Sequence, residues 1–418
     1  MNLFKIKRTA ASALPLLSGA LAILLAVSII LAPESSFAAS LQGVKLWWTL
    51  VFPALLPFLI LSEMLSASGF VHALGVLLSP LMTRLFRLPG AGGWTLALGL
   101  TAGFPAGAES AAKLHKQGGV TADAAARLAS LAHFASPVTI VIVIGTGLLH
   151  SPEAGYVLLG VHWAAGLLAG VTAARLPRQA APAPAGGADP AAPGSAAAGQ
   201  TPRGRTRASL PARMHQAAAD ARAADGRSFG KLLGESVTAA VARLMVVGGF
   251  IIIFAVAVNI LGALLPLLPA ALGPALLEMH LGANALAVSP LPATTQPSTS
   301  ALTLALMSAA LGWSGICAQL QAVTALRPAN AALRPFAVQR ALHALYAFAL
   351  TPLCWKSLSA AGTQALPASA GADVSVRTQA GNLWSFIPGL LGLQAMLLIG
   401  LTLLSAIVYV IYRRRPAG

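Results

Sequence analysis

Residues Ala97–Leu114 read ALGLTAGFPAGAESAAKL, an apolar segment that begins like a membrane helix and is interrupted in its middle. Gly103 and Pro105 both disfavour a continuous helix, and Glu109 places a charge just after them. A broken helix leaves N–H and C=O groups unpaired, and hydrocarbon tolerates these only where protein, water or a bound solute satisfies them. The segment therefore predicts a membrane protein with broken helices around a polar site.

The same segment allows a second interpretation, in which the interruption serves packing alone. Glycines recur every fourth residue from Gly99 to Gly107 and form a small-residue face that brings helices together without a ligand. Pro105 then marks the start of the next helix, and Glu109 pairs with Lys113 one turn later. The sequence leaves both interpretations open.

The composition predicts a membrane protein. Of the 418 residues, 57% are hydrophobic and only 9% are charged, which is too apolar for a soluble core of ordinary proportions. Several runs reach the roughly 20 apolar residues that a crossing helix needs, and none alternates as a strand would. We expect an all-α polytopic membrane protein with about 8–10 membrane segments, arranged in two repeats with broken or re-entrant helices.

The positive charge is better explained by topology than by nucleic acid. The net charge is +16, but nine of the 27 lysines and arginines lie between Arg175 and Lys231, and others cluster at both ends of the chain. These positions flank apolar runs, as the positive-inside bias requires. We expect a multi-pass protein of the cell membrane, with the lipid bilayer as its partner, no nucleic acid, and both termini and the central linker in the cytoplasm.

Signatures of enzymes and bound metals are missing from the sequence. Cys317 and Cys354 lie in apolar runs, and the eight histidines show no paired metal spacing. Ser314 in GWSG lies within an apolar helix and forms no nucleophile elbow. We expect no enzymatic activity, no cofactor and no metal.

An Ala/Pro-rich segment divides the chain into two membrane halves. If both termini and this segment are cytoplasmic, each half crosses an even number of times, so we expect the proline-broken run 267–289 to be re-entrant. The expected parts are a leading membrane helix (1–40, more consistent with an uncleaved anchor than with a signal peptide), a first repeat (41–176), a disordered cytoplasmic linker (177–227), a second repeat (228–356), a loop (357–385) and a C-terminal membrane helix with a basic tail (386–418).

Three landmarks recur in the same order in both halves and indicate an internal duplication. The first is an acid–Met pair after a proline-interrupted run, at Glu63 and Glu278. The second is a tryptophan in a glycine-broken helix, in GGWTLALGLTAGFPAGA and SAALGWSGICAQLQAV. The third is a histidine in a helical run, His133 and His343. Duplicated halves with broken helices at corresponding places are typical of transporters.

These residues also carry a resemblance to a known family. The stretch FPALLPFLILSEMLSASGFVHALGVLLSPLMTRLFRLPGAGGWTLALGLTAGFPAGAESAAKLHKQGGVT is similar to the YlbJ-type sporulation integral membrane proteins of endospore-forming bacteria. LLEMHLGANAL, LGWSGICAQLQA and ALHALYA extend the resemblance, so that it covers about residues 40–355. That family carries the nucleoside-recognition or Gate domain, which also occurs in nucleoside transporters and ferrous-iron transporters.

The resemblance implies a role in building a heat-resistant spore, within the programme that makes the cortex, in the mother-cell or forespore-surrounding membrane. It implies no substrate. Relatives often have a lysine after the GFPAGA element and asparagines around His133 and Phe134, whereas this chain has Glu109 and HFAS. The chemistry of relatives therefore does not transfer directly.

The candidate binding residues are the landmark residues and those at the interruptions. A carboxylate inside a membrane segment costs about 2.5–3.5 kcal/mol, so we expect Glu63 and Glu278 either to face a partner, water or a solute, or to lie at a helix end close to headgroup water. We expect Arg340 either to pair with Glu278 or to extend toward the interface. The candidates are Glu63, Gly103, Pro105, Glu109, His133, Glu278, Gly312, Ser314, Gly315 and His343.

Two functions fit this pattern. The first is a transporter-like protein that handles a small polar solute, such as a nucleoside, ion or metabolite, between the two repeats. The second is a membrane assembly factor without transport activity that docks other sporulation membrane proteins and uses the glycine faces for packing.

Overall fold

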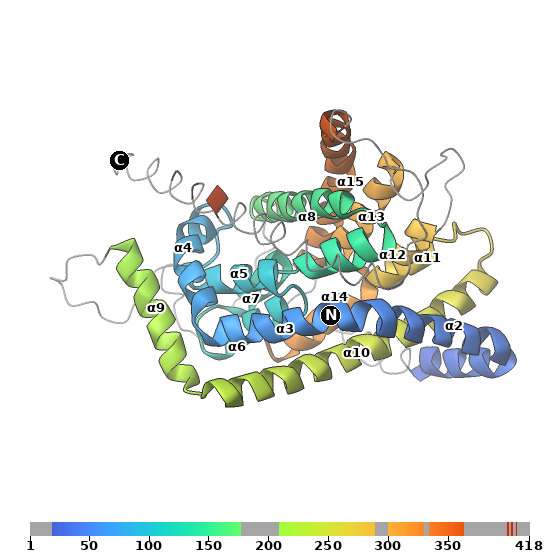
Figure 1. Ribbon diagram of the computed structural model, residues 1–418, viewed down its shortest axis with the longest axis horizontal. Helices are drawn as coiled ribbons and strands as arrows, with labels where there is room; N and C mark the ends of the chain where they lie inside the picture. Colours follow the sequence, from blue (N-terminus) through green and yellow to red (C-terminus); the bar gives the residue numbers. More distant parts are fainter. Residues whose placement is uncertain are drawn as a thin grey trace, which may run out of the picture.

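The computed structural model describes residues 19–176, 209–288, 300–329 and 334–362, together with residues 399, 400, 403 and 407. All regular elements in these ranges are helices, which confirms the all-α prediction (Figure 1). The expected C-terminal membrane helix (386–418) lies almost entirely outside the described residues, as does most of the loop before it.

Several described helices are long and apolar enough to cross a membrane, as expected for a polytopic protein. They are Pro33–Ala67, Pro152–Ala173, Phe229–Leu264 and Ala301–Ala329. Shorter apolar helices are Gly19–Leu31, Phe70–Arg84, Thr139–Leu148 and Met279–Val288. The exact number of crossings stays a prediction.

Two long helical runs lie side by side along one edge of the molecule (Figure 1). The first run comprises α2 (Pro33–Leu46), the π-helical turn η1 (Trp47–Val51) and α3 (Phe52–Ala67); the second is α10 (Phe229–Leu264). Trp47, near the middle of the first run, donates from Nε1 to the carbonyl of Leu244 near the middle of the second (2.9 Å). Asn259, near the end of the second run, donates to Ser35 near the start of the first (3.3 Å), so the two runs are antiparallel.

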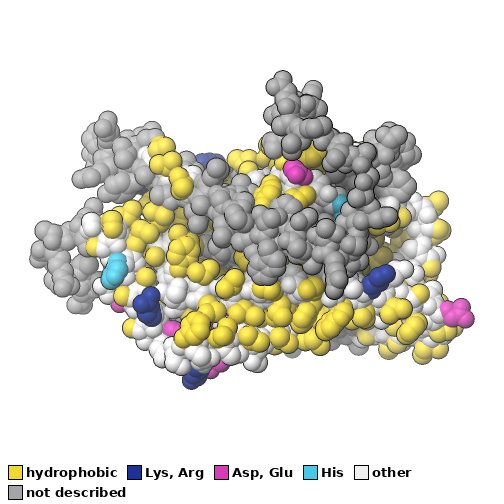
Figure 2. Space-filling model, viewed as in Figure 1, with side chains coloured by type: hydrophobic (Ala, Val, Ile, Leu, Met, Phe, Trp, Pro, Cys, Tyr) yellow, Lys and Arg dark blue, Asp and Glu magenta, His cyan; other side chains and the backbone are white. Residues whose placement is uncertain are grey.

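The outer face of this pair is apolar. Figure 2 shows a band of hydrophobic side chains along the edge where α2, α3 and α10 lie. Leu61 on α3 and Met245 on α10 are both 56% exposed. Because a continuous apolar band of this kind is unstable in water, we infer that it contacts lipid.

Part of the expected disordered linker is a helix, which corrects the predicted range 177–227. Residues Leu210–Asp225 form α9, and this helix packs on α4 (Phe70–Arg84), where a Cβ on Gly69 would collide with Ala218. The helix begins after Ser209 with a proline in its first turn and ends at Gly226 in the left-handed conformation, both ordinary helix boundaries. Residues 177–208 lie outside the described part.

The remaining helices form a bundle behind the long pair. In it, α15 packs against both α8 and α13, and fully buried side chains such as Trp163 and Phe336 fill the core. The bounds are η2 (Gly90–Gly92), α5 (Gly93–Thr101), α6 (Ala106–Lys116), α7 (Ala122–Leu131), η3 (Thr139–Leu148), α8 (Pro152–Ala173), α11 (Leu272–Leu277), α12 (Met279–Val288), α13 (Ala301–Trp313), α14 (Gly315–Leu326), η5 (Arg327–Ala329) and α15 (Arg334–Gly362).

Several helix pairs in this bundle are interrupted rather than continuous. The α5–α6 interruption contains Gly103, with φ of 78°, and Pro105; the α13–α14 interruption is Ser314, with φ of 70°. Glu278 is extended between α11 and α12, so the run expected to be re-entrant is two short helices. The fourth interruption, residues 132–136, follows α7 and ends at Pro137, which favours extended backbone before it and begins the helical turn that leads into η3.

Candidate functional site

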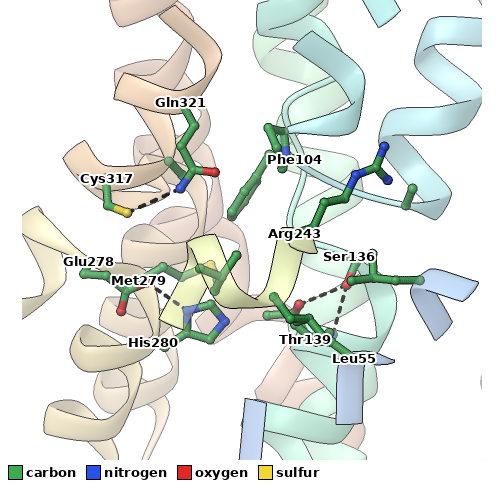
Figure 3. A pocket seen from close by; sticks show the side chains of 16 residues that line it. Leu55, Phe104, Ser136, Thr139, Arg243, Glu278, Met279, His280, Cys317 and Gln321 are labelled. Carbon is green, nitrogen blue, oxygen red and sulfur yellow. Dashed lines mark hydrogen bonds and ion pairs between the residues drawn. The ribbon is translucent and has the colours of Figure 1, made fainter. Parts of the chain in front are cut away.

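The four interruptions meet around one space of about 70 Å³, here called the inner cavity (Figure 3). Each interruption, or the first turn after it, contributes part of the wall. Phe104 and Pro105 come from the first, and Cys317 comes from the turn after Ser314. The polar side chains that line the inner cavity are Ser136, Thr139, Arg243, Glu278, His280 and Gln321.

The first interruption is fixed by the backbone of residues 132–136. Phe104, which is joined to Pro105 by a cis peptide bond, donates its N–H to the Phe134 carbonyl (2.8 Å). A Cβ on Gly99 or Gly107 would collide with the carbonyl oxygen of Ala132. The small-residue face therefore packs tightly, and the packing itself holds the interruption at the cavity wall.

The α13–α14 interruption at Ser314 contacts both the 132–136 interruption and the Glu278 interruption. Nε2 of His133 lies 3.0 Å from the hydroxyl oxygen of Ser314, and a Cβ on Gly315 would lie 3.0 Å from the Glu278 Cα. Gly312, one turn earlier, lies against the Ala344 backbone of α15. The interruptions thus form one contiguous group.

Arg340 is fully buried and holds helix ends together, which corrects both expectations, that it pairs with Glu278 and that it extends toward the interface. Its guanidinium donates to the carbonyls of Ser130 (2.6 Å) and His133 (2.7 Å) and lies 3.5 Å from that of Gly312. No carboxylate of the described residues lies within 4.0 Å of it. The negative ends of α7 and α13 solvate this cation in place of a counter-ion.

Two histidines, together with Arg340, stabilise the backbone behind the inner cavity. His162 Nε2 accepts a hydrogen bond from the Ala135 N–H (3.0 Å), so it satisfies a backbone donor of the 132–136 interruption. His343 donates from Nε2 to the His162 carbonyl (2.8 Å) and lies with Nδ1 3.1 Å from Arg340. His343 therefore orders the structure behind the inner cavity and does not line it.

Glu278 and His280 form a buried polar pair at the cavity. Nδ1 of His280 lies 2.8 Å from one carboxylate oxygen, and the other oxygen accepts the Leu281 N–H (2.8 Å), which caps the N-terminus of α12. Both residues are at most 5% exposed. Nε2 of His280 is buried and has no hydrogen-bond partner among the described residues, and the His280 side chain forms part of the wall of the inner cavity (Figure 3).

A second, more open space of about 200 Å³, here called the outer cavity, adjoins the first. Glu63 and Glu109 line it with Lys113, and Arg243 lines both cavities. Arg243 lies 3.6 Å from the Glu109 carboxylate and 3.9 Å from that of Glu63. The expected Glu109–Lys113 pair is therefore replaced by a Glu109–Arg243 pair.

The rim of the outer cavity continues into the α9–α10 corner. Arg227 lies 4.0 Å from Glu63 and donates to Asp225 and Glu235. Its hydrogen bonds hold the pKa of Asp225 below its usual value. The corner is thus a solvent-facing charge cluster, whereas the inner cavity has buried polar groups.

The structure separates the predicted site residues into three sets. Pro105 and Glu278 line the inner cavity, and Glu63 and Glu109 line the outer cavity. The supporting set behind the wall is Gly103, His133, Gly312, Ser314, Gly315 and His343.

Two landmark pairs are not equivalent in the structure. Glu63 lies within unbroken α3, whereas Glu278 is itself an interruption. His133 follows the end of α7, whereas His343 lies inside α15, so the expectation that both lie in helical runs is wrong for His133.

Sequence reasoning missed Arg243, His280 and His162. A signal existed for Arg243, which interrupts the apolar run of α10 with a charge, because an ionisable residue inside a membrane segment marks a site by default. His280 stands two residues from Glu278, but only the extended Glu278 backbone turns both side chains to the same cavity.

Comparisons with known proteins agree with the helical membrane architecture. Residues 48–149 match the Gate family, described as nucleoside recognition. The sporulation integral membrane protein YlbJ of Bacillus subtilis (strain 168) is 33% identical over 381 residues, which cover 86% of this chain and 85% of that protein. No solved structure matches the chain.

Proposed function

Because the chain belongs to the family of YlbJ-type sporulation integral membrane proteins, we propose that it carries a small polar solute across a membrane of the sporulating cell, through the inner cavity. The observation that carries this proposal is the meeting of four helix interruptions, from both halves of the chain, around one cavity with polar side chains.

The energetics of the bilayer support a polar occupant. Interrupted helices expose main-chain groups that lipid does not satisfy, and such backbone occurs at membrane depth only within protein or beside a polar cavity. Both carboxylate oxygens of Glu278 have hydrogen-bond partners, whereas Nε2 of His280 is buried without one among the described residues, and such burial is costly. A cavity that water or a solute enters explains why these groups lie together.

The size of the inner cavity indicates a closed state. Its 70 Å³ holds about two to five water molecules, whereas pockets for drug-sized ligands span roughly 300–1,000 Å³. A nucleoside therefore requires the walls to move apart, while an ion or a very small metabolite does not.

The proposed cellular role is based on the similarity to the sporulation integral membrane protein YlbJ. We propose that the protein acts in the mother-cell or forespore-surrounding membrane and supports formation of the cortex and of heat-resistant spores. The positive flanks favour cytoplasmic termini and a cytoplasmic linker. Other sporulation membrane proteins are candidate partners.

Reconstitution into proteoliposomes tests the proposal, with radiolabelled uridine as the first probe and a panel of ions and small metabolites after it. We expect Glu278→Gln to lower uptake at least tenfold while the protein stays folded, and Glu153→Gln, which lines neither cavity, to transport normally. Three results together reject the transport role in favour of the assembly-factor role. No probe is taken up, cells with Glu278→Gln form heat-resistant spores normally, and cells with Gly312→Leu lose both assembly of the protein and heat resistance.

A further inference from the structure

The two cavities share part of their wall. Arg243 and Ala102 line both, and the outer cavity is the more open of the two. Arg243 is 38% exposed at its side chain, whereas Cys317 in the inner wall is 4% exposed. A solute that reaches the inner cavity from the outer one must pass this shared wall.

The Arg243 side chain is held there by three different elements. It projects from α10, and the carboxylates beside it belong to Glu63 on α3 and Glu109 on α6. α6 begins directly after the Gly103–Pro105 interruption, so one partner of Arg243 is rigidly linked to the broken-helix wall. An ion pair across these elements couples the position of α10 to that of the interruption.

We propose that Arg243, with Glu63 and Glu109, is a latch that closes the inner cavity toward the outer cavity. This inference rests on the proposed function, because a latch matters only if the inner cavity exchanges its contents. The Arg243 guanidinium lies 3.6 Å from the Glu109 carboxylate and 3.9 Å from that of Glu63, and the three side chains are 31–47% exposed. Ion pairs this exposed are weak, so they can break each time the inner cavity opens.

The native cysteines provide a direct test that needs no substrate. Cys317 lines the inner cavity, and Cys354 on α15 lines neither cavity. In the Cys354→Ala background, the rate at which a small membrane-impermeant methanethiosulfonate modifies Cys317 reports how often the inner cavity opens to water. The full-length chain in lipid nanodiscs is the sample, and a cationic and an anionic reagent are compared.

We expect Arg243→Ala to accelerate modification of Cys317 about three- to tenfold, since removing weak ion pairs worth up to about 1.4 kcal/mol shifts an equilibrium tenfold at most. The Glu63→Gln/Glu109→Gln double variant keeps the arginine and removes its partners, so it is expected to do the same. Arg213→Ala on the exposed start of α9 is the matched control and leaves the rate unchanged.

The rate of Cys354 modification, measured in a Cys317→Ala background, distinguishes a latch from general loosening of the helix packing. If Arg243 is a latch, adding Arg243→Ala to this background leaves the Cys354 rate unchanged. Equal Cys317 rates in the parent, Arg243→Ala and the double variant overturn the latch, and so does a parallel increase at Cys354. Faster Cys317 modification together with an absence of flux for every probe keeps the latch and rejects the solute proposal.

Discussion

Nε2 of His133 lies 3.0 Å from the hydroxyl oxygen of Ser314, and this contact joins an interruption in the first half of the chain to one in the second half. The carbonyl of the same histidine accepts a hydrogen bond from Arg340. The two halves are therefore connected at the points where their helices break, and the inner cavity depends on both.

Ser314 is the first residue whose substitution tests this connection. Its φ of 70° favours glycine. Ser314→Ala loses the hydrogen bond and keeps the unfavourable backbone, so we expect about 1 kcal/mol of destabilisation. Ser314→Gly loses the same bond but relaxes the backbone, and it is expected to unfold close to the parent temperature. Equal thermal midpoints for parent and Ser314→Ala in detergent contradict this role.

Arg340 is expected to be the most sensitive position. Arg340→Met leaves two hydrogen-bonded carbonyls without a donor in a buried environment, at a cost of about 1–3 kcal/mol each. We expect little folded protein on size-exclusion chromatography, with Arg340→Lys intermediate because lysine keeps the charge without the guanidinium fork. A normal yield of monodisperse Arg340→Met shows that the interruptions do not need this cation.

The glycine face yields a prediction with an internal control. Gly99→Ala and Gly107→Ala place a Cβ against the Ala132 carbonyl and are expected to lower the thermal midpoint. Gly160→Ala on α8 meets no atom within 4 Å, so it is expected to be neutral or stabilising by up to about 1 kcal/mol. The same loss of stability in all three variants means that the tight approach at Ala132 is unimportant.

Glu278 has a capping role that is separable from its charge. Glu278→Ala removes the acceptor for the Leu281 N–H and is expected to cost about 1 kcal/mol. Glu278→Gln retains an acceptor, so its thermal midpoint is expected to stay closer to the parent while transport is lost. Thermal unfolding and flux measured on both variants distinguish the roles, and normal flux in a folded Glu278→Gln protein removes the charge from the mechanism.

The sequence was sufficient to predict the class of fold and the first interruption. Gly103 and Pro105 act locally through backbone preference, so an interruption is readable without tertiary information. The boundaries of α9 were readable too, from Ser209 and Gly226, but its Ala-rich surroundings favoured a linker.

The composition of the inner cavity was not predictable in the same way. Which side of a membrane helix faces a cavity depends on packing, and α10 shows nearly uniform hydrophobicity around Arg243. The roles of Arg340 and His162 depend on backbone atoms more than 20 residues away in sequence, and composition does not reveal such contacts.

A cryo-EM map of the full-length protein in lipid nanodiscs, at a resolution that shows ordered water, tests most directly whether the helix interruptions surround a polar cavity. We expect the interruptions at Gly103–Pro105 and Ser314 to face each other, with density for water or a polar solute next to Glu278 and His280. Interruptions that point apart, or a space between them filled by lipid chains, contradict this expectation.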